Sequence, residues 1–276
     1  MKKKLKRTTD PTQVDFHNMF RLDDRIVVIT GGMGLIGKAF TEICAQYGAN
    51  VVILDIPNTK PEEYAIKLEK RFSRSMLGIS MDVSNRSEVK KSLDIILENF
   101  NKVSDLVNCH HNKSKSFFTK FEDYLDKEWA EIIDTNLNGT FLTCQIIGGW
   151  MVENGGGNIV NLPSLYSVVA PNQKLYKGTT MGSPAAYGAS KGGIMTLSNY
   201  LASYWADKGV RVNQLTPHGV WNNHEKEFED RFKNFLPLER MSYNYEIAGA
   251  LLYLISDASS FVTGHNLIVD GGWSLW

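Results

Sequence analysis

Tyr187 and Lys191 are the residues of this chain whose types and spacing point most directly to chemistry. They lie four residues apart in a stretch, 183–206, whose composition predicts a helix. Residues at i and i+4 share one face of a helix, so the phenol and the ammonium would face the same space. A nearby ammonium favours the phenolate and would lower the phenol pKa from about 10 towards the range in which an acid/base catalyst works. The same pair also occurs on solvated helix faces, so its meaning depends on the elements that position it.

The first of these elements is a glycine-rich turn. The apolar run 25–30 predicts a buried parallel strand, and 30–37 then fits the pattern T-G-x-x-G-x-x-G before an amphipathic segment. Glycines permit a tight turn and let backbone amides approach a pyrophosphate, while the helix N-terminus adds partial positive charge. A second apolar strand over 51–55 completes a unit that is typical of dinucleotide binding. The cofactor contacts predicted in the turn are Gly31, Met33, Gly34, Leu35 and Ile36.

Acidic residues at the ends of the next strands bear on the choice of cofactor. Asp55 closes the second strand 18 residues beyond Gly37, where a carboxylate can accept hydrogen bonds from the adenosine ribose. It favours NAD over NADP, whose 2′-phosphate it would repel, although the basic Lys60 nearby leaves NADP open. Asp82 and Val83 close the third strand at a position suited to the adenine edge. A helix-capping role is the alternative for Asp82.

The rest of the chain continues the alternation of strands and helices. Further strands are expected at 75–83, 104–108, 156–162, 210–216 and 266–270, and helices at 61–72, 85–100, 125–154, 183–206 and 245–257. This pattern predicts an α/β fold, a doubly wound sheet of seven parallel strands with helices on both faces and right-handed crossovers. A length of 276 residues suits one domain, expected over 22–276 after a tail and lead-in over 1–21.

Composition argues against several other classes of protein. Thirty basic and thirty acidic residues cancel, unlike a nucleic-acid footprint, and no apolar stretch approaches the ~18 residues of a membrane span. The basic residues at 1–7 precede no apolar run, so they predict a solvated tail rather than a signal peptide, with membrane or partner attraction as the alternative. Cys44, Cys109 and Cys144 have neither disulfide nor zinc-ligand spacing. Adjacent His110 and His111 would point to opposite faces of a strand. We expect a cytoplasmic protein with no metal, no nucleic acid and no membrane partner.

Two long segments interrupt the alternation. Residues 166–182 separate the fifth strand from the helix of Tyr187, and residues 220–238 follow the sixth strand. Both leave the carboxyl ends of strands, where open α/β sheets bind ligands, so both are candidate substrate loops or lids. Surface decoration is the alternative for either segment.

Two more polar residues complete the set. Ser164 follows the fifth strand and places a hydroxyl at the carboxyl edge of the sheet. Asn136 lies in the middle of a predicted helix, where Asn is a poor helix former, which suggests a functional or kink-forming role. The motifs occur in one order from Leu22 to the C-terminus: 30–37, Asn136, Ser164, Tyr187 and Lys191. In this order they resemble the short-chain dehydrogenase/reductase family, whose fold is of the Rossmann type.

The resemblance implies a role for each of these residues. Tyr187 would be the acid/base, and Ser164 would orient the carbonyl or carbinol of the substrate. Lys191 would hold the nicotinamide ribose and lower the pKa of Tyr187, while Asn136 would support a water in the proton relay. Tyr187 and Lys191 would both touch the cofactor, which also meets the segments after the fourth and sixth strands at Asn108, Pro217, Gly219 and Val220. A homotetramer or homodimer is implied as well.

The sequence departs from the family pattern in three places. Compact members carry T-G-x-x-x-G-x-G, and Leu35 stands where that pattern needs a glycine. The usual N-N-A-G after the fourth strand is replaced by residues 108–111, Asn-Cys-His-His. Ser164 and Tyr187 are 23 residues apart, which is more than the usual spacing in the family.

The glycine turn, the long insertion and the run 168–171 also resemble a subgroup that acts in bacterial surface-sugar pathways, including sialic-acid-like sugars of the legionaminic acid type. The insertion carries hydrogen-bonding residues suited to a polyol or phosphosugar: Asn172, Gln173, Lys174, Tyr176, Lys177, Thr179 and Thr180. We therefore expect NAD-dependent hydride transfer between a secondary alcohol or ketone and nicotinamide, on a sugar, sugar phosphate or nucleotide sugar. The alternatives are a reductase of a small keto or acyl substrate and a non-catalytic NAD-sensing regulator.

Overall fold

Seven strands form one parallel sheet, as expected. The computed structural model describes residues 10–112, 119–176 and 184–275. In this part of the chain the strand order is β3-β2-β1-β4-β5-β6-β7, and every neighbouring pair is parallel. The order reverses between β1 and β4, which is where doubly wound sheets bind ligands. The strands are β1 (Ile26–Thr30), β2 (Asn50–Asp55), β3 (Met76–Ser80), β4 (Asp105–Asn108), β5 (Gly157–Asn161), β6 (Val210–Pro217) and β7 (Asn266–Val269).

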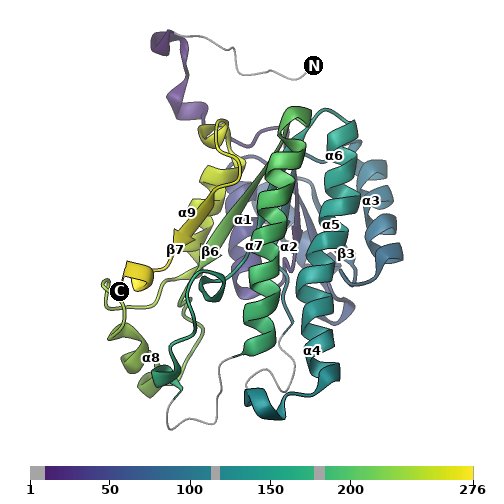
Figure 1. The fold of residues 1–276 in the computed structure, drawn as a ribbon. Helices are drawn as coiled ribbons and strands as arrows, with labels where there is room; N and C mark the ends of the chain where they lie inside the picture. Colours follow the sequence, from purple (N-terminus) through teal and green to yellow (C-terminus); the bar gives the residue numbers. More distant parts are fainter. Residues whose placement is uncertain (1–9, 113–118, 177–183, 276) are drawn as a thin grey trace.

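Alternation along the strands produces the two packed faces of the sheet. In β1, Val27 and Ile29 pack with residues of α1, α2 and α9, whereas Ile26 and Val28 pack with α3, α5, α6 and α7. Figure 1 shows α7 and the column of α4 to α6 on one side of the sheet, and α1, α2 and α9 on the other. The helices are α1 (Leu35–Gln46), α2 (Pro61–Phe72), α3 (Arg86–Phe100), α4 (Asp126–Ile133), α5 (Gly139–Thr143), α6 (Gly149–Glu153), α7 (Ala185–Trp205), α8 (Lys226–Lys233) and α9 (Asn244–Ile255).

One crossover differs from the expectation that all are right-handed. The steps from β4 to β5, β5 to β6 and β6 to β7 run in the same direction across the sheet. The first two connections pass over the face covered by α7, but α9 packs on the opposite face beside α1. The connection from β6 to β7 therefore has the opposite hand from the other two. The apolar side of α9, centred on Ile247 and Leu251, is buried against α1, and this packing overrides the usual preference.

The connection from β4 to β5 is one helical column, as predicted, but two π-helical turns interrupt it. They span Asp134–Asn138 and Cys144–Gly148. Asn136 lies in the first turn with a fully buried side chain that bonds outside the helix. A poor helix former with partners elsewhere is thus accommodated by local unwinding, which is frequent at functional sites.

Both predicted substrate loops are partly folded. The first contains short 3₁₀ turns at Leu165–Ser167 and Gln173–Leu175, and its residues 177–182 lie outside the described part of the chain. The second contains α8, which the sequence analysis did not expect. This helix is eight residues long, and its two apolar residues, Phe228 and Phe232, stand four positions apart among six charged ones. Tertiary packing stabilises it, because the Phe232 ring lies 4.8 Å from that of Trp273 near the C-terminus.

These two loops and the C-terminal turn share a small core of their own. We refer to this set as the loop cluster: Leu165, Leu175, Phe232, Leu236, Met241 and Trp273, all buried. Trp273, close to the C-terminus, is buried in this cluster. Trp276 lies outside the described residues.

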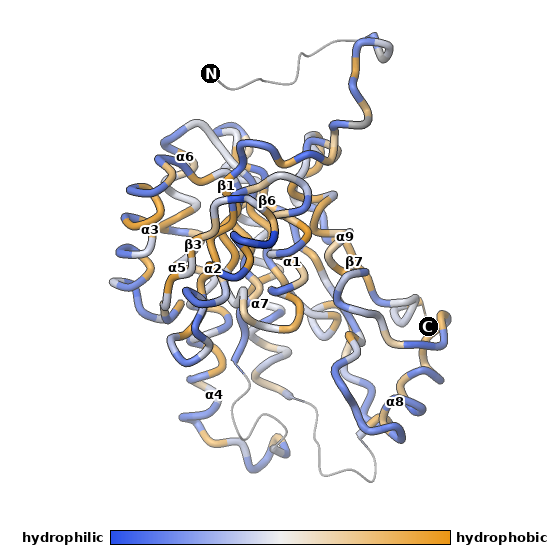
Figure 2. Tube along the Cα trace, turned by 180° about the vertical axis from the view of Figure 1, so that it is seen from behind, coloured by the Kyte–Doolittle hydropathy of each residue, from blue (hydrophilic) through white to orange (hydrophobic). Residues whose placement is uncertain are grey.

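The lead-in lies apart from the site. Residues 10–21 form two 3₁₀ turns and leave the body of the protein at the end opposite α4 and α8 (Figure 1). Hydrophobic residues concentrate in the strands and the inner sides of the helices, whereas α8 is largely hydrophilic (Figure 2). Within the described ranges, no helix combines the length and apolar character needed to cross a bilayer.

Candidate active site

The glycine turn borders a cavity of about 760 Å³ at the carboxyl edge of the sheet. Gly31 has a φ of +67°, and a Cβ there would lie 2.7 Å from the backbone of His110. A Cβ on Gly37 would lie 2.1 Å from the backbone oxygen of Gly31, so neither position accepts a side chain. Gly34 is the N-cap residue of α1, and no described side chain caps that helix end. All five residues predicted to contact a cofactor line the cavity: Gly31, Met33, Gly34, Leu35 and Ile36.

Asp55 lines the same cavity from the end of β2. Its carboxylate accepts hydrogen bonds from the backbone amides of Met33, at 2.9 Å, and Ile56, at 2.8 Å. Lys60, the basic residue that left NADP open, pairs instead with Glu63 at 2.9 Å and is not a lining residue. Among the described residues that line the cavity, Lys191 is the one lysine, and none is an arginine.

Asp82 and Val83 also line the cavity, but the carboxylate of Asp82 has a local partner. It accepts hydrogen bonds from the Ser84 amide at 2.9 Å and the Ser84 hydroxyl at 2.7 Å. The N-cap of α3 is Asn85, whose side chain accepts from the amides of Ser87 and Glu88. Asp82 thus stabilises the turn before α3 through its bonds to Ser84, and it also lines the cavity.

Ser164, Tyr187 and Lys191 converge on this cavity. Tyr187 and Lys191 project from one face of α7, as their spacing predicts, with Lys191 Nζ 5.7 Å from the centre of the Tyr187 ring. The side chains of Tyr187 and Ser164 are hydrogen-bonded. Lys191 is 3% exposed and donates a hydrogen bond of 2.7 Å to the backbone oxygen of Leu162. Ser164 lies two residues beyond Leu162, so α7 and the end of β5 are joined at the site.

The protonation of the pair differs from the sequence expectation. Burial raises the pKa of Tyr187, and the hydrogen bond from Ser164 opposes this only in part. Burial also lowers the pKa of Lys191 to about 8. The predicted lowering of the Tyr187 pKa by Lys191 is therefore not found. Desolvation outweighs attraction here, because the phenolate would be buried and the amine is directed at Leu162.

Asn136 lies behind this group rather than on the cavity wall. Its side-chain oxygen accepts from the Asn112 amide at 2.7 Å, and its side-chain nitrogen donates to the Ser190 hydroxyl at 3.0 Å. Ser190 directly precedes Lys191 and donates to the backbone oxygen of Tyr187 at 2.8 Å. Asn136 therefore connects the chain after β4 to α7 and positions the helix that carries Tyr187 and Lys191.

Asn108, predicted to contact the cofactor, is not among the residues that line the cavity. Its side chain is buried between β4 and its neighbours, donating to Asn161 at 2.8 Å and accepting from Thr143 at 2.8 Å. Both the nitrogen and the oxygen of the Asn108 side-chain amide are thus hydrogen-bonded inside the fold. The structure places Asn108 as a bridge between strands.

His110 and His111 take up the positions where the family usually has Ala-Gly. His110 is buried, with Nδ1 2.6 Å from the hydroxyl of Thr30 and Nε2 3.3 Å from that of Thr140. Burial lowers the pKa of His110 to about 3, so the ring is neutral at physiological pH. His111 is exposed and meets the Tyr187 ring edge-on, with centroids 6.3 Å apart. Among the described residues, no group of three His, Cys, Asp or Glu side chains is arranged to hold a metal ion.

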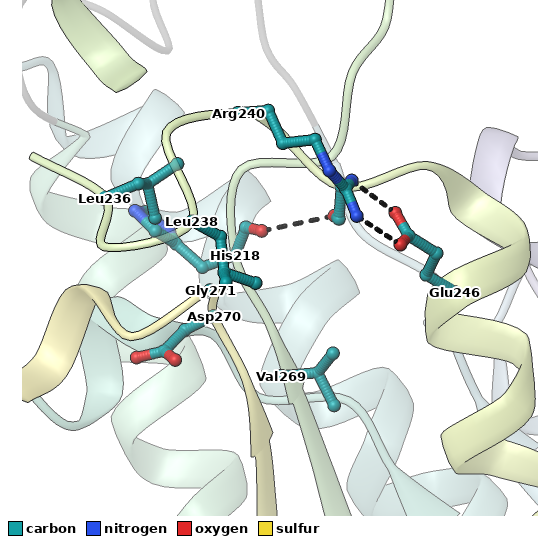
Figure 3. Close-up of a pocket in the computed structure, with 9 residues that line it drawn as sticks. His218, Leu236, Leu238, Arg240, Glu246, Val269, Asp270 and Gly271 are labelled. Carbon is teal, nitrogen blue, oxygen red and sulfur yellow. Dashed lines mark hydrogen bonds and ion pairs between the residues drawn. The ribbon is translucent and has the colours of Figure 1, made fainter. Parts of the chain in front are cut away.

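The segment after β6 forms another wall of the cavity through Pro217, Gly219 and Val220. Gly219 has a φ of +59°, and a Cβ there would lie 2.4 Å from the Phe232 ring. Between Pro217 and Gly219, His218 separates this cavity from a smaller one of about 80 Å³, shown in Figure 3. The ring of His218 lies 4.6 Å from that of Trp273, and burial lowers its pKa to about 4. The His218 ring is therefore neutral and forms an aromatic part of the wall between the two cavities.

Arg240 and Glu246 border the smaller cavity. Their side chains face each other in Figure 3 and form an ion pair of 2.7 Å. Both side chains are partly exposed, and such a pair adds little to stability. Its effect here is to connect the segment before α9 to that helix.

The cavity wall includes residues that were not singled out from the sequence, namely Tyr166, Asn222 and His224, and also Tyr176, which was named among the hydrogen-bonding residues of the insertion. Tyr166 and Tyr176 come from the first substrate loop, and Asn222 and His224 come from the second. The sequence contained a signal for them, since both loops were expected to border the substrate. The sequence contained no signal for how these residues are arranged relative to one another. The Tyr166 and Tyr176 hydroxyls lie 2.7 Å apart although ten residues separate them.

The chain is similar to known proteins over nearly its whole length. A family model described as Enoyl-(Acyl carrier protein) reductase matches residues 34–274. An NAD-dependent glycerol dehydrogenase of Listeria innocua is 32% identical over 94% of this chain and 98% of its own. The post-translational flagellin modification protein A of Campylobacter coli is 29% identical over 92% of this chain and 100% of its own. A crystal structure of a short-chain dehydrogenase from Leptospira borgpetersenii with bound NAD+ superposes with a TM-score of 0.82, at 34% identity, over 95% of this chain and 96% of that one. With its sheet order, its glycine turn and these matches over nearly its whole length, this chain belongs to the short-chain dehydrogenase/reductase family of nicotinamide-dependent oxidoreductases.

Proposed function

We propose that this protein interconverts a secondary alcohol and a ketone on a sugar or polyol, with NAD as its cofactor. One observation carries the proposal. Tyr187, hydrogen-bonded to Ser164 and beside the buried Lys191, lines the same cavity as the glycine turn. Proton transfer and cofactor binding are thus served within one cavity.

The proton chemistry follows from the positions of these side chains. A nicotinamide cofactor, when bound, accepts or supplies the hydride. During oxidation Tyr187 takes the proton of the substrate hydroxyl, and during reduction it returns a proton to the carbonyl oxygen. The Ser164 hydroxyl, already paired with Tyr187, holds the same substrate oxygen. Lys191 supplies positive charge close to the phenol, and its bond to Leu162 keeps it there.

The residues present fit a dinucleotide. Side chains are excluded at Gly31 and Gly37, and the uncapped N-terminus of α1 suits a pyrophosphate. A cavity of about 760 Å³ is of the size that cofactor sites have. We infer NAD rather than NADP, because Asp55 lines the cavity and Lys60 is paired with Glu63. A 2′-phosphate would meet the Asp55 carboxylate without a basic partner.

A polar substrate is inferred from the walls around Tyr187. Tyr166, Tyr176, Asn222 and His224 contribute hydroxyl, amide and imidazole groups to the cavity. The glycerol dehydrogenase of Listeria innocua supports a polyol or sugar as substrate. The surface-sugar subgroup, including sialic-acid-like sugars, stays a prediction.

A reductase of a small keto or acyl substrate is the second candidate. The description of the matching family model favours it. The polar groups near Tyr187 favour the sugar, because an acyl chain needs an apolar channel. The cytoplasmic location and the assembly into a homotetramer or homodimer also stay predictions. Light scattering on the purified protein tests the assembly.

The test is NADH formation on a panel of glycerol, threitol, galactitol, phosphorylated and nucleotide-linked sugars, sialic-acid-type sugars and simple secondary alcohols. We expect turnover on members of the sugar or polyol set. Tyr187→Phe should lose about 10²–10⁴-fold in kcat/KM, because it lacks the transferable proton. Tyr200→Phe, on the exposed side of α7, is the matched control and should keep full activity. Turnover of an acyl substrate alone would reject the sugar assignment. Full activity of Tyr187→Phe would reject the mechanism.

A further inference from the structure

We propose that Tyr166 and Tyr176 form a binding site for a second hydroxyl of the substrate, on the carbon next to the one that reacts. The inference rests on the proposed function and narrows its substrate to compounds with two neighbouring oxygens. It concerns specificity, and the transfer of the proton remains with Tyr187.

The two phenols form a pair beside the reacting groups. Their hydroxyl oxygens lie 2.7 Å apart, and both residues line the cavity that holds Tyr187 and Ser164. The backbone amide of Tyr166 donates to the Ser164 hydroxyl at 3.3 Å, so the pair begins two residues from the group that orients the substrate oxygen. Each phenol can both donate and accept hydrogen bonds. The bond between the two hydroxyls engages one O–H donor and one acceptor of the pair.

The three phenols lie close enough to influence one another electrostatically. Tyr176 raises the pKa of Tyr187, and Tyr187 raises that of Tyr166, in addition to the effect of burial. Burial also raises the pKa of Tyr176. Tyr166 and Tyr176 thus remain neutral over the working pH range. Neutral phenols recognise a hydroxyl or carbonyl oxygen, and they offer no counter-charge to a cation.

Buried neighbours hold the pair in place. Leu165 and Leu175 directly precede the two tyrosines, and both are fully buried in the loop cluster. The ring of His218, itself packed on Trp273, lies 5.9 Å from that of Tyr166. Both tyrosines are therefore positioned before a substrate arrives. A preorganised pair of hydroxyls discriminates more strongly than a mobile one, because less ordering is needed on binding.

The chemistry of the pair predicts which substrates fail. A site built to hydrogen-bond a hydroxyl rejects an analogue that lacks it, since its own polar groups are then left without a partner. An alcohol with one oxygen would leave the Tyr166–Tyr176 pair facing a methyl or methylene group. A vicinal diol would place its second oxygen there.

The test compares 2,3-butanediol with 2-butanol, using the full-length protein and NAD. Both carry a secondary carbinol next to a methyl group, and only the diol has a neighbouring hydroxyl. We expect the wild type to prefer the diol by about 10-fold or more in kcat/KM. Tyr176→Phe and Tyr166→Phe keep the rings and remove the hydroxyls. Each should lower the preference for the diol over 2-butanol about 10-fold, because the removed hydroxyl serves the neighbouring oxygen that only the diol carries. Tyr204→Phe, exposed on α7, should leave this preference unchanged.

Three outcomes overturn this inference while leaving the proposed function intact. The first is equal efficiency of the wild type on the two alcohols. The second is a Tyr176→Phe variant that retains the full preference for the diol over 2-butanol. Turnover of a sugar on the panel without turnover of the diol also overturns it, because the neighbouring hydroxyl would then not be the recognised group. Failure of every alcohol and sugar rejects the proposed function itself.

Discussion

Lys191 Nζ donates a hydrogen bond of 2.7 Å to the backbone oxygen of Leu162, and this bond joins α7 to the carboxyl end of β5. It also fixes the distance between Lys191 and Tyr187 on one side and between Tyr187 and Ser164 on the other. An ammonium that is 3% exposed is costly to bury, and burial accordingly lowers its pKa to about 8. The chain thus retains a destabilising charge at the site where the proposed chemistry needs it.

This cost leads to a prediction about stability and pH. The pKa of Lys191 is about 8 in the folded protein and 10.5 as its ordinary value, so between these values the unfolded chain binds more protons. Stability contributed by Lys191 therefore rises with pH through this window, by about 3 kcal/mol in total. Denaturant unfolding of the wild type and Lys191→Met at pH 8 and pH 10.5 checks this. From pH 8 to pH 10.5, the free energy of unfolding of the wild type should rise relative to that of the variant. A difference between the two proteins that is the same at both pH values would contradict the prediction.

Cofactor choice should depend on Asp55. Asp55→Asn keeps the shape of the side chain and removes its charge. We expect kcat/KM with NAD to fall about 10-fold, through loss of a charged acceptor, and kcat/KM with NADP to rise, through loss of repulsion. Lys60→Ala is the control, since Lys60 is paired with Glu63. A fall in NADP use in Lys60→Ala would instead identify Lys60 as a phosphate partner.

Two glycines should respond in opposite ways to alanine. At Gly37 a Cβ would lie 2.1 Å from the backbone oxygen of Gly31 and 2.8 Å from Gly32 Cα, so the turn must move. We expect Gly37→Ala to destabilise the protein by about 2–3 kcal/mol and to weaken NAD binding. A Cβ on Gly249 in α9 would have no neighbouring atom within 4 Å, so Gly249→Ala should stabilise by about 0.5–1 kcal/mol. Thermal unfolding and NAD titration of both variants measure the contrast.

Acid should destabilise the protein through His110. Its pKa is about 3 in the folded protein against an ordinary 6.5, so between these values the unfolded chain holds the extra proton. The stability contributed by His110 is present above pH 6.5 and is lost as pH falls towards 3, by up to about 5 kcal/mol. In His110→Ala this loss should be absent. The free energies of unfolding of the two proteins, measured at a series of pH values, should therefore approach each other as the pH falls. A difference in stability that stays constant with pH would mean that His110 has the same pKa in the folded and the unfolded protein.

The order of elements could be predicted because it is written in local patterns. The run 26–30 is apolar and β-branched, and the glycines after it suit only a turn, whatever surrounds them. Tyr187 and Lys191 could be paired for the same reason, since a helix puts i and i+4 on one face. Residues such as Ser164 that follow predicted strands could be assigned to one edge of the sheet.

Contacts between distant segments could not be predicted in this way. Helix α8 packs through Phe232 on Trp273, some forty residues away in sequence, a contact that no local pattern predicts. Asn108 was expected at the cofactor, but Asn161 on the next strand takes its side chain. The hand of the last crossover depends on how α9 packs against α1.

By itself, then, the sequence determined the parallel α/β architecture, the glycine turn and the placement of Tyr187 and Lys191 on one helix face, because each depends on a short-range period or on the conformational freedom of single residues. Only the tertiary structure decided the protonation of Tyr187 and Lys191, the pairing of Tyr166 with Tyr176 and the positioning role of Asn136. These depend on desolvation and on contacts between residues far apart in the chain, which no local pattern encodes.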